Sequence, residues 1–222
     1  MMAFRVVVLA LLMIARGGPG IYEDWRQEQE TQQPRKTSEP YKGDLSIFET
    51  PGREERLQIN RVMDILGIGA GKSVADIGAG SGWFTVRAAK RTAGAPVYAV
   101  DINPDAIRYI TDRAKKEKLA NVKAVLSTAD DPMLPEKSVD AVLILKTYHE
   151  VAKPIELMKH VHDALRAGGK VGIIDRNGDG EDHGIQKDVV IREVGEAGFR
   201  VVNQYDFVKG DNMDYFLVLE LR

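Results

Sequence analysis

The stretch VADIGAGSGWF, residues 74–84, decides the fold. A short apolar run reaches Asp76, and glycines at positions 78, 80 and 82 follow before an aromatic pair. A strand that enters a glycine-rich turn and continues into a helix is typical of α/β folds that bind a nucleotide at the strand ends. The stretch therefore predicts a nucleotide-like ligand at this turn.

The rest of the chain alternates between strand and helix patterns. Strands are expected over residues 72–78, 95–102, 121–127, 138–145 and 170–175, and helices over residues 53–68, 84–92, 103–119, 154–169 and 185–199. The last part, residues 200–221, is expected to form two strands around KGDN at residues 209–212. This alternation predicts an α/β fold with a doubly wound, mostly parallel seven-stranded sheet and a C-terminal antiparallel hairpin.

The beginning of the chain differs in composition from the rest. Residues 1–20 carry one early cation and an apolar run at 6–15, which is too short to span a membrane and has the length found in signal peptides. A cleavage site is not evident, so a mis-assigned start or a short buried helix is the alternative. Residues 21–43 are polar and are expected to be a flexible linker before a single domain at 44–222. Export or membrane tethering follows if 1–20 is a signal or anchor, and a cytoplasmic location otherwise.

Composition excludes several functions. The chain has 222 residues, a formal net charge of −2 and no cysteine. Thiolate metal sites, cysteine nucleophiles and disulfides are therefore excluded. A charge near zero gives no basic footprint for a nucleic acid, so no nucleic-acid partner is expected.

The spacing of the glycines distinguishes between nucleotides. A dinucleotide site uses Gly-x-Gly-x-x-Gly, and Trp83 occupies the position of its third glycine, which argues against NAD or FAD. The pattern Asp-x-Gly-x-Gly-x-Gly instead resembles the first motif of class I S-adenosylmethionine-dependent methyltransferases. Glycine gives the cofactor a bare backbone to lie against.

The resemblance continues in order over residues 45–222. VYAVDINPDA resembles the ribose-binding segment of that family, STADDPMLP its adenine-binding segment, and SVDAVLILKTYHEV its fourth-strand motif. LRAGGKVGIID and EAGFRVV resemble later segments. The N-terminus, TYHEV and the fifth-strand aspartate also resemble a bacterial group of predicted exported methyltransferases.

The resemblance implies S-adenosyl-L-methionine (SAM) as the cofactor. Asp76 would meet the ammonium group of SAM, and Asp101 would accept hydrogen bonds from its ribose diol. Thr128 departs from the family by standing where an acidic residue is usual. The expected cofactor-binding residues are Asp76, Gly78, Ala79, Gly80, Ser81, Gly82, Asp101, Ile102, Ala129 and Asp130.

The segment after the fourth strand supplies the expected catalytic residues. His149 is the candidate general base, because an imidazole titrates near neutral pH. Glu150 would orient His149 or bind the acceptor, and Tyr148 would pack against the sulfonium or the acceptor. Alternatively, Tyr148 and His149 only shape the wall of the site.

The expected acceptor is a small molecule. Methylation of amino groups on nucleic-acid bases is disfavoured. Enzymes with that activity usually have a Pro-Pro-aromatic sequence after the fourth strand, where this chain has Thr147-Tyr148-His149. The expected substrate-binding residues are Lys146, Asp175 and His183.

Residues 175–186 begin like an EF-hand calcium loop, with Asp175, Asn177, Asp179 and Gly180 in place. Gln186 stands where that loop needs a bidentate glutamate, so no metal is expected, and Mg²⁺ stays a minor option. Two rival functions remain open. One is a transferase with a related donor such as decarboxylated SAM, and the other is a SAM-binding sensor or interaction module without turnover. The sequence leaves the oligomeric state open.

Overall fold

The computed structural model describes residues 35, 37, 41, 43–178, 183–208 and 214–222. The expected signal or anchor, positions 179–182 of the calcium-like loop and the turn at 209–212 lie outside these residues. Within the described part of the chain, no helix is both long and apolar enough to cross a membrane. The compact unit begins at Arg35, inside the expected linker, because the Arg35 guanidinium pairs with Glu193 at 2.6 Å.

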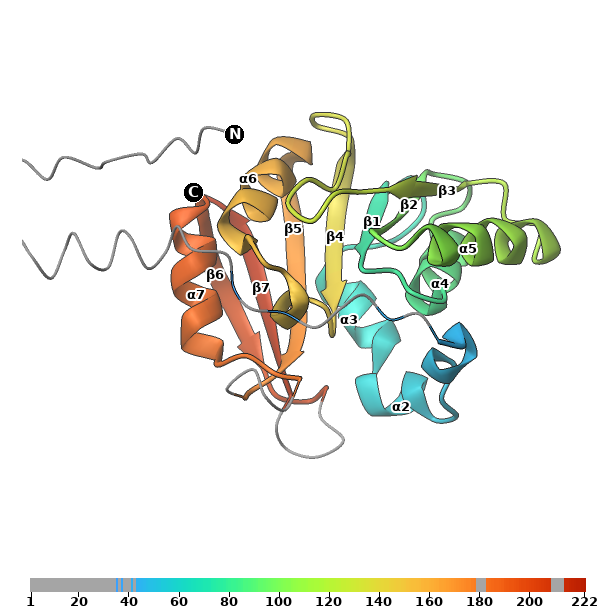
Figure 1. The fold of residues 1–222 in the computed structure, drawn as a ribbon. Coiled ribbons are helices and arrows are strands. Elements are labelled where there is room, and N and C mark those ends of the chain that lie inside the picture. The colour runs from blue at the N-terminus through green and yellow to red at the C-terminus, as the bar shows by residue number, and fades with distance from the viewer. Residues whose placement is uncertain (1–34, 36, 38–40, 42, 179–182, 209–213) are drawn as a thin grey trace, which may run out of the picture. The chain divides into compact units, whose positions relative to one another are not determined.

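The core of the unit is a seven-stranded sheet in the order β3-β2-β1-β4-β5-β7-β6 (Figure 1). Strand β7 runs antiparallel to both β5 and β6, and all other neighbours are parallel. The predicted sheet with its C-terminal hairpin is thereby confirmed. The strands are β1 (Val74–Ile77), β2 (Val97–Asp101), β3 (Val122–Leu126), β4 (Val139–Leu145), β5 (Leu165–Arg176), β6 (Phe199–Tyr205) and β7 (Asp214–Leu221).

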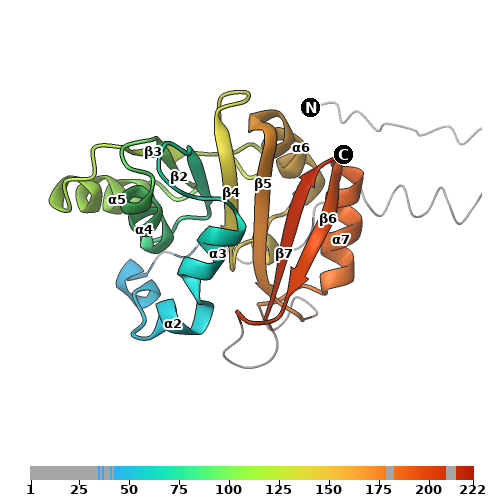
Figure 2. The ribbon, with the colours of Figure 1, turned by 180° about the vertical axis from the view of Figure 1, so that it is seen from behind.

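Helices cover both faces of the sheet, as the two opposite views in Figures 1 and 2 show. Buried side chains of α3 and α4 pack on one face, and those of α6 and α7 pack on the other. The helices are α2 (Arg53–Leu57), α3 (Ile59–Ile65), α4 (Trp83–Arg91), α5 (Pro104–Lys116), α6 (Pro154–Ala164) and α7 (Lys187–Glu196), with 3₁₀ turns η1 (Leu45–Phe48) and η2 (Tyr148–Glu150).

Two elements differ from the sequence prediction. The helix expected over residues 53–68 is broken into α2 and α3, because Gln58 adopts a left-handed φ of 47°. The helix expected over 154–169 ends at Ala164, and the chain continues directly into β5. Leu165 already pairs with Val139 of β4, so sheet pairing replaces the last helical turn.

The strand order places the site. The chain moves outward from β1 through β2 to β3, and then crosses back to β4 on the other side of β1. Ile77 near the end of β1 lies opposite Ile144 near the end of β4. Ligands in such sheets bind beyond the carboxyl ends of the strands where the order reverses, and the glycine turn lies at this point.

Candidate functional site

The glycine loop after β1 has a backbone that only glycine adopts easily. Gly78, Gly80 and Gly82 have φ values of 74°, 56° and 74°, all in the left-handed region. A Cβ on Gly78 would lie 2.2 Å from Cγ2 of Thr147, so Gly78 also allows the loop after β4 to approach. The loop therefore presents bare backbone to the crevice, as the sequence predicts.

Asp101 joins this loop to the end of β2. Its carboxylate accepts the backbone N–H of Gly80 at 2.8 Å and that of Asn103 at 2.9 Å. A carboxylate offers about four acceptor positions, so two remain for a ligand. Asp101 is partly exposed and lines the cavity, which suits the expected contact with a ribose diol.

Asp76 is a buried carboxylate at the bottom of the site. It is 2% exposed, and the Thr85 hydroxyl donates a 2.6 Å hydrogen bond to it. Burial raises the pKa of Asp76 to about 6, although the hydrogen bond from Thr85 and the charge of Arg53 act in the opposite direction. A cationic ligand group beside Asp76 would favour its ionised form, as the ammonium of SAM would.

One cavity of about 790 Å³ connects these groups with the end of β4. Its volume lies within the range of about 300–1,000 Å³ that is usual for small-ligand sites. Of the expected residues, the cavity is lined by Asp76, Gly78, Ala79, Gly80, Asp101, Ile102, Ala129, Lys146, His149, Glu150 and His183. The bare glycine backbone, the buried carboxylate and the exposed edge of Ile102 fit SAM.

Three expected cofactor residues lie outside the lining of this cavity. The Ser81 hydroxyl donates to Glu49 at 2.6 Å, and a Cβ on Gly82 would lie 3.2 Å from Ile110. The Asp130 carboxylate accepts hydrogen bonds from Lys153 at 2.9 Å and from the Thr128 hydroxyl at 3.0 Å. The cofactor-binding role of these three residues stays a prediction.

Tyr148 does not occupy the expected position beside the sulfonium or acceptor. Its side chain is fully buried in the core between the sheet and helices α6 and α7, outside the lining of the cavity. Burial, with the charge of Glu193, raises the pKa of Tyr148 well above its ordinary value. The tight turn of η2 directs Tyr148 inward and the next residue, His149, toward the cavity.

His149 is held by Asp175 from the neighbouring strand. Asp175 is fully buried and accepts the His149 Nδ1–H at 2.8 Å and the His149 backbone N–H at 3.0 Å. Burial disfavours the charged imidazole, but the hydrogen bond that His149 donates to Asp175 and the charges of Asp175 and Glu150 outweigh it and raise the pKa of His149. Asp175, an expected substrate-binding residue, lies behind His149 and outside the lining of the cavity.

Three further side chains complete this end of the cavity. The Lys146 ammonium pairs with the Asp214 carboxylate. The Glu150 carboxylate lies 3.3 Å from His149 Nε2 and 3.5 Å from His183 Nδ1. The His183 side chain is 76% exposed. The sequence identified these residues singly, and the adjacency of β4 and β5 brings them together.

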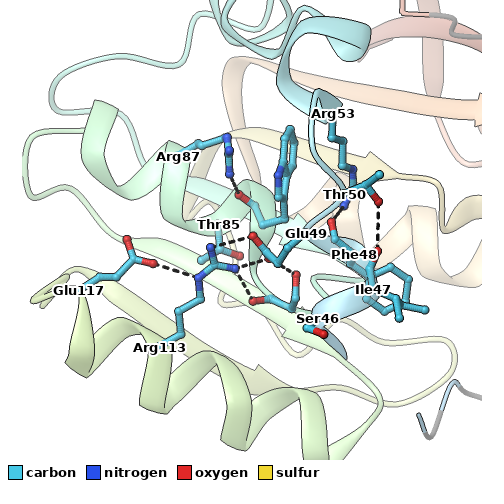
Figure 3. A network of polar contacts seen from close by, with 12 residues as sticks. Ser46, Ile47, Phe48, Glu49, Thr50, Arg53, Thr85, Arg87, Arg113 and Glu117 are labelled. Atoms are coloured by element: carbon cyan, nitrogen blue, oxygen red, sulfur yellow. Dashed lines mark hydrogen bonds and ion pairs between the residues drawn. The ribbon is translucent and has the colours of Figure 1, made fainter. Parts of the chain in front are cut away.

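A segment that sequence reasoning missed also contributes to the site. The N-terminal strap, residues 44–50, contributes Leu45, Ile47 and Phe48 to the cavity wall. Figure 3 shows its Glu49 held by Arg113, which approaches at 3.1 Å through Nη2. The available sequence signal was the group of apolar residues Leu45, Ile47 and Phe48 in a polar region.

The ring of Trp83 forms a second anchor near the strap. The guanidinium carbons of Arg53 and Arg87 lie 4.5 Å and 4.0 Å from the centre of the ring. The ring also lines the cavity and is 3% exposed. Trp83 therefore packs beneath the glycine loop where a dinucleotide fold would require glycine.

Comparisons with known proteins agree with this geometry. Residues 74–169 match the family described as "Methyltransferase domain". An uncharacterized methyltransferase of Mycobacterium bovis is 35% identical over 105 residues, covering 47% of this chain and 40% of the relative. A demethylmenaquinone methyltransferase of Tropheryma whipplei is 32% identical over 111 residues, covering 50% of this chain and 44% of the relative. The chain thus spans less than half the length of these curated relatives.

A solved structure supports the fold over a longer range. A SAM-dependent methyltransferase from Aquifex aeolicus superimposes with a TM-score of 0.73 at 22% sequence identity, covering 82% of this chain and 100% of that chain. At this level of identity the likeness shows the fold. The chain therefore has the Rossmann-like fold of this solved methyltransferase, and residues 74–169 match the methyltransferase domain family.

Proposed function

We propose that the protein is a SAM-dependent methyltransferase that acts on a small-molecule acceptor. One observation carries the proposal: the glycine loop and His149, which is hydrogen-bonded to Asp175, line the same cavity. A cofactor on the loop and an acceptor beside His149 would therefore meet in one cavity.

Each cofactor group has a partner in this proposal. The ammonium group would lie near Asp76, the ribose diol would donate to Asp101, and the adenine ring would lie between Ile102 and Ala129. SAM supplies a methyl group on a positively charged sulfur. Ile102 is 44% exposed in the structure, and an adenine ring would cover it.

The other end of the cavity would hold the acceptor. Methyl transfer is an in-line displacement, so the protein's main task is to align the acceptor atom with the methyl carbon and the sulfur. His149 donates two hydrogen bonds to one buried carboxylate, which gives it a defined orientation. An acceptor that must lose a proton would meet this imidazole directly.

The strap supports a small acceptor. Leu45, Ile47 and Phe48 line the cavity with apolar side chains, and Glu49 is anchored by Arg113 and Ser81. An apolar wall suits a compact ligand with an apolar face better than a charged polymer. The formal net charge of −2 likewise gives no attraction for a nucleic acid.

A product screen tests the proposal. Purified full-length protein is incubated with SAM and a panel of phenols, catechols, hydroxy acids and amines, and S-adenosylhomocysteine and methylated products are measured by mass spectrometry. Product is expected with at least one acceptor class and is expected to disappear in Gly80→Val, whose side chain occupies the cofactor space. SAM binding without S-adenosylhomocysteine from any class would contradict an enzyme and support a sensor without turnover.

A further inference from the structure

The acceptor end of the cavity contains a group of potential metal ligands. His149 and Glu150 come from η2 after β4, and His183 follows β5. One ligand atom from each of the three lies within 4.8 Å of the other two. We name these residues the His–Glu–His cluster, and we propose that it binds a divalent transition-metal ion that in turn binds an acceptor oxygen.

The spacing of the ligand atoms matches that around a metal ion. Two ligands that are each about 2.1 Å from one ion lie roughly 3.0–3.4 Å apart in octahedral or tetrahedral geometry. The Glu150 Oε1 atom is 3.3 Å from His149 Nε2 and 3.5 Å from His183 Nδ1. A small rotation of the exposed His183 ring would complete the set.

Asp175 supplies the support that metal-bound histidines usually have. Histidine ligands commonly donate their second ring N–H to a carboxylate, which fixes the ring and its tautomer. The fully buried Asp175 carboxylate lies 2.8 Å from His149 Nδ1 and also accepts the backbone N–H of Arg176 at 2.8 Å. With Nδ1 donating to Asp175, the Nε2 lone pair is left for a cation on the side of Glu150.

The contact between Nε2 and Glu150 also requires a positive charge. Two acceptors, the Nε2 lone pair and a carboxylate oxygen, repel each other at 3.3 Å unless a cation or a proton lies between them. A metal ion bound to Nε2 would meet this requirement, and a second proton on Nε2 is the competing outcome.

The ligand types indicate which metals the cluster would select. Two imidazoles and one carboxylate suit Zn²⁺, Fe²⁺ or Mn²⁺, while Mg²⁺ and Ca²⁺ prefer oxygen ligands alone. Three protein ligands also leave coordination positions for a substrate. The cluster lines the same cavity as Gly78 and Gly80, so the open coordination positions of the metal would face the methyl donor.

This metal site deepens the proposed methyltransferase function and rests on it for the reaction. The acceptor class would be a hydroxyl compound with a second oxygen close enough to chelate the ion. The ion lowers the pKa of the bound hydroxyl, so its proton leaves to water. The oxygen then bonds to the methyl carbon, the carbon–sulfur bond breaks, and its electron pair stays on sulfur. His149 acts here as a ligand in place of a base.

Metal binding is measured without turnover. Full-length protein without a histidine tag is stripped with a chelator, and ZnCl₂ and MgCl₂ are titrated separately by calorimetry in the absence of SAM. The proposal predicts one Zn²⁺ per chain and no Mg²⁺ heat. Visible absorption of the Co²⁺-loaded protein gives an independent signature of imidazole and carboxylate coordination.

Variants assign the ligands. Replacing a residue that is hydrogen-bonded to a metal ligand typically weakens metal binding 10–100-fold. Loss of a direct ligand in Glu150→Gln or His183→Ala should therefore weaken Zn²⁺ binding about 100-fold or more. Asp175→Asn should weaken it about 10–100-fold while thermal unfolding confirms a folded chain. The exposed His160 on α6 provides the matched control, and His160→Ala should bind Zn²⁺ normally.

The outcomes separate this proposal from the proposed function. The metal site alone would be overturned if the stripped protein binds SAM but does not bind Zn²⁺, or if Zn²⁺ binding is unchanged in Glu150→Gln and His183→Ala. Either result would support a second proton on His149 Nε2. Zn²⁺ binding that depends on the cluster, without SAM binding, would overturn the methyltransferase proposal alone.

Discussion

Replacing Asp101 with alanine tests the cofactor assignment quantitatively. The Asp101 carboxylate lines the cavity and keeps acceptor positions after binding the N–H groups of Gly80 and Asn103. A hydrogen bond to a charged group contributes about 1.5–3 kcal/mol. Losing one ribose bond should therefore raise the SAM dissociation constant about 10–150-fold. Loosening of the Gly80 turn would add to this effect.

Calorimetric titration of the full chain with SAM and S-adenosylhomocysteine measures the change, and thermal unfolding identifies any loss of the fold. Asp130→Ala is the matched control, because its carboxylate binds Lys153 and Thr128 outside the cavity lining. Its affinity should stay within about twofold of wild type, since it loses no direct bond. Unchanged affinity in a folded Asp101→Ala protein would refute the ribose assignment.

Three further predictions follow from the same contacts. Gly78→Ala should lower the free energy of unfolding by more than about 1–2 kcal/mol, because the left-handed φ costs that much and a clash with Thr147 adds to it. In denaturant titrations, adding Thr147→Ala should recover part of this loss, because it removes the Thr147 atoms 2.2 Å and 2.3 Å from the new Cβ. Additive effects of the two substitutions would refute the clash. Folded Asp76, with a pKa raised to about 6, keeps its proton up to a higher pH than Asp76 in the unfolded chain. The free energy of unfolding should therefore fall by about 2 kcal/mol between pH 4 and pH 7, relative to the flatter Asp76→Asn profile. Identical profiles would argue against a buried titrating carboxyl. Glu49→Ala should speed SAM dissociation about tenfold in stopped-flow experiments, because the strap loses the charged hydrogen bonds between Glu49 and Arg113. An unchanged dissociation rate would mean that the strap does not retain the cofactor.

The sequence predicted the fold and the cofactor loop because both depend on local pattern. Alternating strands and helices define a parallel sheet, and three glycines at fixed spacing define the turn after its first strand. Boundaries were less predictable. Gln58 breaks a continuous amphipathic pattern through a single left-handed residue, and Leu165 leaves the helix because it pairs with Val139.

The acceptor end depended on contacts between distant segments. The sequence identified His149, Glu150, Asp175 and His183 as candidates, but only the pairing of β4 with β5 shows that Asp175 is buried behind His149. Likewise, no local pattern distinguishes a Tyr148 that faces the core from one that faces the cavity. The strap was not predicted because the residue that binds it, Arg113, is distant from Glu49 in the sequence.

Calorimetric titration of the full-length protein with SAM, S-adenosylhomocysteine and NAD tests the central claim most directly. The glycine loop, Asp101 and Trp83 predict saturable binding of SAM and S-adenosylhomocysteine, one molecule per chain, and no binding of NAD. Binding of NAD without binding of SAM would contradict the assignment of the cavity and the function built on it.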